Sequence, residues 1–136
     1  MARMVCKLLQ DLAWKQGKTI ITTIHQPSSE SFHFFDRLLL MCDGKVVYQG
    51  LGQKVVPYFG EMGYTFPKFS NPADGFMKII SVNYPKQDED IKKIADLVDH
   101  YQLKMASKVT EQYQAITCYA PDLGKSSTLH RTSMAI

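Results

Sequence analysis

The stretch Thr19-Ile20-Ile21-Thr22-Thr23-Ile24-His25-Gln26-Pro27 decides the expected fold of this chain. Its β-branched run predicts a buried strand, because such side chains pack well on a pleated sheet surface. The strand ends at His25 and Gln26, and Pro27 stops it. Ligands of open α/β sheets bind outside the carboxyl ends of the strands, so this position makes His25 a candidate functional residue.

The residues before this strand predict an amphipathic helix that ends at Gly17. Its apolar stripe consists of Val5, Leu8, Leu9, Leu12 and Ala13. Residues 1–4 contain no Ser, Thr, Asp or Asn to cap the first turn, which favours a helix belonging to a longer chain.

Beyond Pro27, the sequence predicts a short helix that continues through the following phenylalanines. The hydroxyl of Ser28 or Ser29 can cap its first turn. Two short strands follow, over residues 38–41 and 45–48. The pair Asp43-Gly44 between them suits the positive φ angles of a type I′ turn, so the sequence predicts a β-hairpin here.

Three helices are expected in the remainder of the chain. The first covers residues 53–62, and the second starts at Asn71-Pro72, a capping residue followed by proline at the first helical position. The third carries an apolar stripe over residues 91–105. From Cys118 onward no period is present, which predicts a flexible tail.

Five short motifs occur in these segments in a fixed order. They are Thr19–Ile21 with His25–Ser29, Phe35–Leu40, Gly44–Gly50, Tyr58–Phe59 with Gly63–Tyr64, and Asn71–Asp74. The first three closely resemble the nucleotide-binding domain of ATP-binding-cassette transporters, and the last two resemble the subfamily named after the white transporter, subfamily G. The resemblance covers roughly residues 5–105.

This resemblance implies an α/β fold, namely the C-terminal part of a P-loop NTPase (ABC ATPase) domain with a β-hairpin and following helices. It also implies a division of the chain into three parts. Residues 1–83 would complete the nucleotide-binding domain, residues 84–114 would form a helical linker, and residues 115–136 would form a flexible tail.

The resemblance makes His25 the switch histidine, which contacts the γ-phosphate of ATP and orients the attacking water. Gln26 would lie beside it in the cofactor-binding loop. An imidazole suits this role because it donates a hydrogen bond to a phosphoryl oxygen while its second nitrogen is held by the protein. ATP and Mg²⁺ are therefore the cofactors expected in the parent protein.

The chain contains neither a G-x-x-x-x-G-K-[ST] loop nor an acidic strand end that could serve Mg²⁺. We therefore expect no tight ATP binding and no hydrolysis by this chain alone. Its expected partners are the missing N-terminal half of the domain, a transporter membrane domain and a second nucleotide-binding domain. The parent would couple ATP hydrolysis, at the cytoplasmic face of a membrane, to transport of a lipid-like or other hydrophobic solute.

Two other interpretations stay open. The chain could be a stand-alone, non-catalytic interaction module that pairs through the stripe over residues 91–105 or occupies the dimer surface of a transporter. A weaker alternative is an independent enzyme that pairs the Cys42 thiol with His25, although a small core residue is the more common role of such a cysteine.

Composition excludes several further classes. The net charge of +3 comes from scattered lysines and arginines, which argues against nucleic-acid binding. The other histidines, His33, His100 and His130, share no spacing typical of metal ligands and are expected at the surface. The three cysteines are expected to be reduced thiols. The longest apolar stretches fall short of the ~20 residues that a membrane-spanning helix needs.

Overall fold

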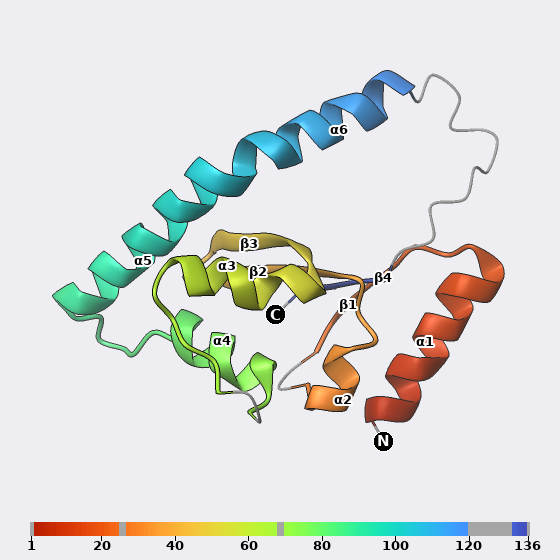
Figure 1. The fold of residues 1–136 in the computed structure, drawn as a ribbon, viewed down its shortest axis with the longest axis horizontal. Helices are drawn as coiled ribbons and strands as arrows, with labels where there is room; N and C mark the ends of the chain where they lie inside the picture. Colours follow the sequence, from red (N-terminus) through yellow and green to blue (C-terminus); the bar gives the residue numbers. More distant parts are fainter. Residues whose placement is uncertain (1, 25–26, 68–69, 120–131, 136) are drawn as a thin grey trace.

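The computed structural model describes residues 2–24, 27–67, 70–119 and 132–135 (Figure 1). In chain order the elements are α1 (Ala2–Gln16), β1 (Ile20–Thr23), α2 (Ser29–Phe32), β2 (Arg37–Cys42), β3 (Lys45–Leu51), the 3₁₀ turn η1 (Gly52–Lys54), α3 (Val55–Glu61), α4 (Pro72–Ile80), α5 (Asp88–Tyr101), the π-helical turn η2 (Gln102–Ala106), α6 (Ser107–Tyr119) and β4 (Thr132–Ala135).

The four strands form one mixed sheet in the order β1-β4-β2-β3. Strand β4 runs parallel to both of its neighbours, and β2 and β3 pair antiparallel. Strand β1 therefore lies at an edge, and its Ile21 side chain is 76% exposed. The prediction of a buried inner strand was wrong, because the described strands flank β1 on one side only and its residues alternate between half-buried and exposed.

The predicted hairpin is confirmed. Asp43 and Gly44 connect β2 to β3 with φ angles of 50° and 75°. A glycine suits the second position because a side chain is strained at positive φ. The register shifts between Leu40 and Met41, where an irregularity accommodates one extra residue of the partner strand.

The predicted helix starts and stops are also confirmed at several places. Helix α1 ends at Gln16, just before Gly17, which has a positive φ angle. The Ser28 side chain accepts a hydrogen bond from the backbone N–H of Ser31 and caps α2. The Asn71 side chain caps α4 in the same way through the N–H of Ala73. These boundaries arise because nearby side chains and glycines pair or release the backbone N–H and C=O groups that a helix end leaves without a partner.

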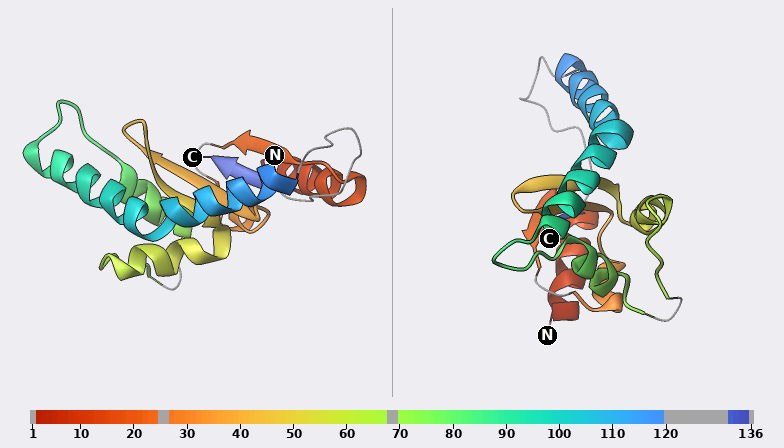
Figure 2. Two further views of the ribbon diagram at one scale, coloured as in Figure 1. Left: turned by 90° about the horizontal axis from the view of Figure 1, so that it is seen from above. Right: turned by 90° about the vertical axis from the view of Figure 1, so that its left-hand side faces the viewer.

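The hydrophobic core lies among the hairpin and helices α3, α4 and α5. Its largest fully buried side chains include Leu38, Leu40, Tyr48, Phe59, Phe76 and Leu97. Aromatic rings pack edge to face within it, and the ring centroids of Tyr48 and Tyr58 are 5.0 Å apart. Helix α1 lies at the opposite end of the long axis from the start of α5 (Figure 2).

Helices α5 and α6 continue into each other through η2 and form one long rod (Figures 1 and 2). The helix predicted over residues 91–105 is thus part of a longer helical segment, which begins at Asp88 and reaches Tyr119. The segment expected to be a flexible tail contains the end of α6 and the strand β4 in its described parts.

The predicted fold class needs correction. The described residues form a small α/β structure, and none of its strands leads through a glycine-rich loop into a helix. Strand β1 leads towards the four-residue helix α2, β2 enters a tight turn, and β3 enters a 3₁₀ turn. The sheet order gives no support for a P-loop NTPase domain, whose phosphate site needs a strand, loop and helix in that sequence.

Candidate functional site

The two predicted site residues, His25 and Gln26, lie outside the described residues. On their two sides, Ile24 packs half-buried against the core and Pro27 is buried. The Asn71 side-chain amide donates a hydrogen bond to the backbone oxygen of Pro27 at 2.8 Å. This bond ties the segment after β1 to the start of α4. The roles predicted for His25 and Gln26 stay predictions.

Cys42 is a core residue. Its side chain is 1% exposed, and its thiol donates a hydrogen bond to the backbone oxygen of Ile80 at 3.1 Å. Burial raises the pKa of the Cys42 thiol, which disfavours the thiolate that a nucleophile needs. Cys6 is buried as well, so the packing interpretation is confirmed for both cysteines.

The histidines differ in their surroundings. His33 is exposed as predicted, whereas His100 is half-buried and its ring lies 4.9 Å from that of Tyr58, centroid to centroid. The prediction of a surface position was therefore wrong for His100, because α5 turns this side chain towards α3. Across the described ranges, no three His, Cys, Asp or Glu side chains are grouped as metal ligands would be.

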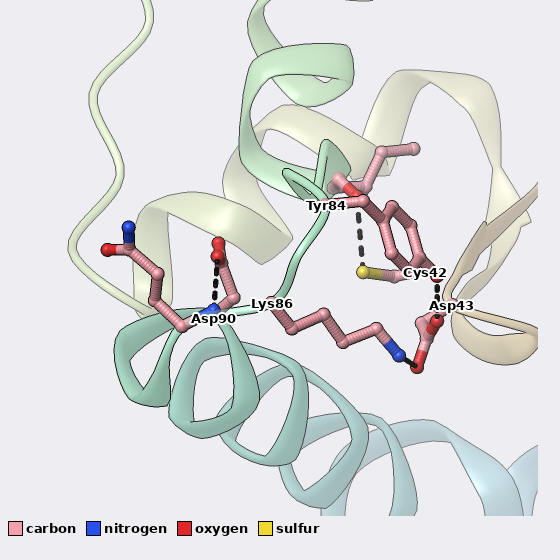
Figure 3. A network of polar contacts seen from close by, with 7 residues as sticks. Cys42, Asp43, Tyr84, Lys86 and Asp90 are labelled. Carbon is pink, nitrogen blue, oxygen red and sulfur yellow. Dashed lines mark hydrogen bonds and ion pairs between the residues drawn. The ribbon is translucent and has the colours of Figure 1, made fainter.

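A polar network holds the hairpin turn to the segment between α4 and α5 (Figure 3). The Asp43 carboxylate accepts hydrogen bonds from the Lys86 ammonium at 2.6 Å and from the Tyr84 hydroxyl at 3.0 Å. These two bonds hold the pKa of Asp43 below its usual value. Both oxygens of the Asp43 carboxylate accept hydrogen bonds within the protein, so we assign the network a structural role.

A groove of about 700 Å³ lies between β3, α3 and the rod and is the best candidate for a functional site. Arg37, Lys54, Lys104 and Lys108 contribute four positive charges to its lining, and Glu61 contributes one negative charge. The rest of the lining is Tyr48, Gln49, Gly50, Leu51, Pro57, Tyr58, Met105, Val109 and Gln112. The groove is therefore basic over a largely apolar and aromatic floor.

The two tyrosines of the floor are rigidly held. The Tyr48 hydroxyl donates to the backbone oxygen of Leu51 at 2.6 Å, and the Tyr58 hydroxyl donates to that of Val47 at 3.0 Å. Burial raises the pKa of Tyr48 to about 12, and it raises the pKa of Tyr58 as well. Both phenols therefore stay neutral and bring no negative charge into the groove.

The close approach of the rod to β3 depends on Gly50. A Cβ atom at this position would lie 3.0 Å from the Tyr48 hydroxyl oxygen and 3.1 Å from the Cε methyl of Met105. Met105 belongs to the π-helical turn η2, a feature that often occurs at functional positions in helices. The Tyr101 hydroxyl adds a hydrogen bond to the Gln49 side chain at 3.3 Å.

Sequence reasoning missed this groove because its charges come from four separate elements. Arg37 begins β2, Lys54 ends η1, Lys104 lies in η2 and Lys108 in α6. The helical spacing of Lys104 and Lys108 was the one local signal, and such a pair is more often a solvated helix face.

Residues 25–133 match the family model described as ABC-2 type transporter. The chain belongs to this family of membrane transporters. This family model represents the membrane domain of ABC-2 transporters. The match therefore overturns our assignment of the chain to the nucleotide-binding domain and to a P-loop ATPase fold. Membership of the family covers most of the chain, including the hairpin, α3, α4 and the rod.

Similar proteins carry names from the same transporter group. The chain is 38% identical over 112 residues to "Protein white" of Ceratitis capitata, a match that covers 82% of this chain and 16% of that protein. It is 39% identical over 99 residues to the mouse "Broad substrate specificity ATP-binding cassette transporter ABCG2", covering 68% of this chain and 15% of that protein.

A third match, 40% identical over 78 residues, is "ABC transporter G family member 11" of Arabidopsis thaliana, covering 57% of this chain and 11% of that protein. The chain thus spans about a sixth or less of these relatives. The white and G-subfamily names support our placement of the chain in subfamily G. Among the described helices, none combines the length and apolar character required to cross a bilayer.

Proposed function

We propose that this chain is part of a G-subfamily transporter that moves a lipid-like or other hydrophobic solute across a membrane. The observation that carries the proposal is the family match over residues 25–133, joined by the white and ABCG2 relatives at 37–39% identity. The charged side chains along the exposed faces of α5 and α6 are compatible with contact to water or lipid headgroups.

Within the transporter, the rod would transmit movement between the sheet and the neighbouring parts. Its α5 half is anchored because Ile94, Leu97 and Tyr101 are buried against the core. A rigid helix packed in this way moves together with the elements it contacts, since close-packed interiors transmit displacement. The α6 half extends beyond the hairpin and is available to other domains (Figure 1).

Binding of ATP and Mg²⁺ would then be the work of other parts of the transporter, which are also the proposed partners of this chain. Incubation of the purified chain with labelled ATP tests this division, and we expect neither tight binding nor turnover. Hydrolysis that is lost in a His25→Ala variant would contradict it and would favour the catalytic role predicted for His25.

A chimera tests the transport proposal directly. Residues 25–133 replace the corresponding stretch of mouse ABCG2, and efflux of a hydrophobic fluorescent dye is measured together with the amount of protein at the cell surface. We expect the chimera to retain transport. A chimera that reaches the surface in normal amount but exports no dye would contradict the proposal.

Two variants of the chimera test the coupling role of the rod. Leu97 is fully buried on α5, whereas Leu103 is 81% exposed in η2. Leu97→Asp should abolish transport because it places a charge in the core contact of the rod. Leu103→Asp adds the same charge to the same rod without disturbing that contact, so it should leave transport intact. Equal effects of the two variants would contradict the coupling role.

The expected pairing through the stripe over residues 91–105 was wrong, because most of this stripe packs against the chain's own core. The stand-alone interaction module remains a second candidate on the basis of another surface. Helix α1 exposes Met4, Val5, Leu8 and Trp14, which are large apolar side chains. Several exposed apolar side chains on one helix are a common feature of contact surfaces. A chain that fails in the chimera yet forms a defined complex or dimer when purified alone would support this candidate over the transporter part.

A further inference from the structure

The groove between β3, α3 and the rod carries more positive charge than its own residues neutralise. Lys104 forms an ion pair with Glu61 at 3.2 Å, which balances both of these charges. Arg37, Lys54 and Lys108 have no ion pair within the part of the chain that the structure describes. Three cations therefore face one hollow without a protein counter-ion.

Lys54 and Lys108 are exposed at the rim of the groove, and Arg37 is half-buried. The cations come from β2, η1 and α6, which are separated along the chain and meet through the tertiary structure. Positive charges around one groove raise the local electrostatic potential and attract anions to it. Their convergence indicates a site for a ligand that carries more than one negative charge, such as a phosphate monoester.

The size and floor of the groove define the rest of the ligand. A volume of about 700 Å³ lies within the ~300–1,000 Å³ usual for small-molecule sites and far exceeds the need of an inorganic phosphate. The floor consists of Leu51, Pro57, Met105, Val109 and two tyrosines whose hydroxyls are already bonded to backbone oxygens. Such a floor suits apolar atoms and offers few free polar partners.

We propose that this groove binds a phosphate-bearing amphiphile, with its phosphate held by Arg37, Lys54 and Lys108 and its apolar part packed on the floor. The flexible thioether of Met105, placed over Gly50 by the π-helical turn, adapts the floor to acyl chains of different shape. The site goes beyond the proposed transport role and does not depend on it, because binding is measured without transport.

The full 136-residue chain is used to identify the source of the phosphate. Three probes are compared, namely inorganic phosphate, soluble short-chain phosphatidic acid, and phosphatidylcholine vesicles with or without phosphatidic acid. Calorimetry measures the soluble probes and co-sedimentation measures the vesicles. We expect short-chain phosphatidic acid to bind at least about tenfold more tightly than inorganic phosphate, since each buried methylene adds ~0.8 kcal/mol.

The vesicle result then separates the two sources. Binding to phosphatidic-acid vesicles, together with the soluble lipid, indicates a headgroup that reaches the groove from a bilayer. Binding of the soluble lipid alone indicates a free amphiphile in solution. Failure of short-chain phosphatidic acid to bind, or binding no tighter than that of inorganic phosphate, would overturn the proposal.

Variants with matched charge locate the site. Lys54→Gln with Lys108→Gln removes two groove cations and should weaken lipid binding about tenfold. The control pair, Lys78→Gln with Lys92→Gln, removes the same charge from exposed positions on α4 and α5 outside the groove lining and should change binding less than about twofold. Equal losses in the two pairs would assign binding to general surface charge and overturn the site.

A gain of binding provides a test that misfolding cannot imitate. Glu61 is the one acid of the groove lining, so Glu61→Gln removes the repulsion of the phosphate and frees Lys104. We expect binding to tighten about threefold. Unchanged or weaker binding of a folded Glu61→Gln variant, judged by circular dichroism, would contradict the arrangement.

Discussion

The β2–β3 hairpin and strand β1 lie at opposite edges of one sheet, and the chain secures them in different ways. Hairpin residues Leu38, Leu40 and Tyr48 are at most 1% exposed, because α3 and α5 cover them. In β1, Ile21 is 76% exposed, and among the described strands only β4 pairs with it. The hairpin is thus stabilised by local pairing and a surrounding core, whereas β1 depends on a strand from the far end of the chain.

This difference shows that strands of similar apolar sequence, β1 and β2, can be exposed at a sheet edge in one case and buried in the core in the other. The hairpin turn brings β2 and β3 together over two residues, so their pairing costs little loop entropy. Pairing of Ile20 with Thr132 closes most of the chain into a loop and costs more. Helix α1, next to β1, also keeps several apolar side chains in solvent. The variants below test this contrast.

The largest effect is expected in the core beside the hairpin. Phe59 is fully buried and its ring contacts those of Tyr48, Tyr58 and Tyr64. Phe59→Ala should lower the free energy of unfolding by about 4 kcal/mol, because it removes buried apolar area and leaves a cavity. Urea unfolding followed by circular dichroism measures the change.

The control for this variant lies on α1. Leu8 is 59% exposed, so Leu8→Ala should change the free energy of unfolding by less than about 0.5 kcal/mol. A loss at Leu8 as large as that at Phe59 would mean that the α1 face is buried in solution, and the contrast between the two regions would be broken.

The next effect concerns the tie between the end of β1 and α4. Asn71→Ala removes both the cap on the N–H of Ala73 and the hydrogen bond to the backbone oxygen of Pro27. We expect a loss of about 2 kcal/mol, roughly half from each bond. Asn71→Asp keeps the capping oxygen but loses the amide donor, so it should lose about 1 kcal/mol. Equal stability of Asn71→Asp and the unmodified chain would show that the bond to Pro27 contributes nothing.

A smaller effect is expected from the turn of the hairpin. Gly44 has a φ angle of 75° and open space around its Cα, so Gly44→Ala tests backbone strain alone. We expect a loss of about 1 kcal/mol. The control, Gly60→Ala in α3, also meets open space and should stabilise the chain by about 0.5 kcal/mol. Stabilisation by both variants would contradict the type I′ turn.

The smallest effect is expected from the Asp43 network and depends on pH. Hydrogen bonds from Lys86 and Tyr84 lower the pKa of Asp43, so its stabilisation is present above the usual aspartate pKa. It is lost as the pH falls below about 4 and through the lowered pKa. Asp43→Asn should reduce this acid-dependent loss of stability, measured by urea unfolding at successive pH values.

The control for this variant is an exposed carboxylate on α5. Asp99→Asn changes the same charge without touching the hairpin network, so the acid-dependent loss should persist. A profile of Asp43→Asn that matches that of the unmodified chain would show that the network in Figure 3 does not couple to folding.

Local features of the fold were predictable because neighbouring residues determine them. The turn at Asp43-Gly44, the cap at Asn71 and the end of α1 at Gly17 all follow from backbone angles and short-range hydrogen bonds. The apolar stripe over residues 91–105 covers only part of the rod, because the helical pattern weakens beyond Met105, where the π-helical turn shifts its phase.

Recognition of motifs led to the correct transporter group but to the wrong domain. Short motifs such as Asn71–Asp74 identify related sequences, whereas assignment to a domain needs a match along the whole chain. The family model supplied that match over residues 25–133. The groove was missed because no single segment contains enough of it to form a pattern.

By itself, the sequence determined the hairpin turn, the ends of several helices and which of its relatives share its motifs. The tertiary structure alone decided that β1 lies at an edge, and that three cations without an ion pair among the described residues meet over an apolar floor. The physical reason is the sequence separation over which each kind of interaction acts. Backbone angles and caps depend on residues a few positions apart, whereas burial and charge convergence depend on elements that meet only after the chain has folded.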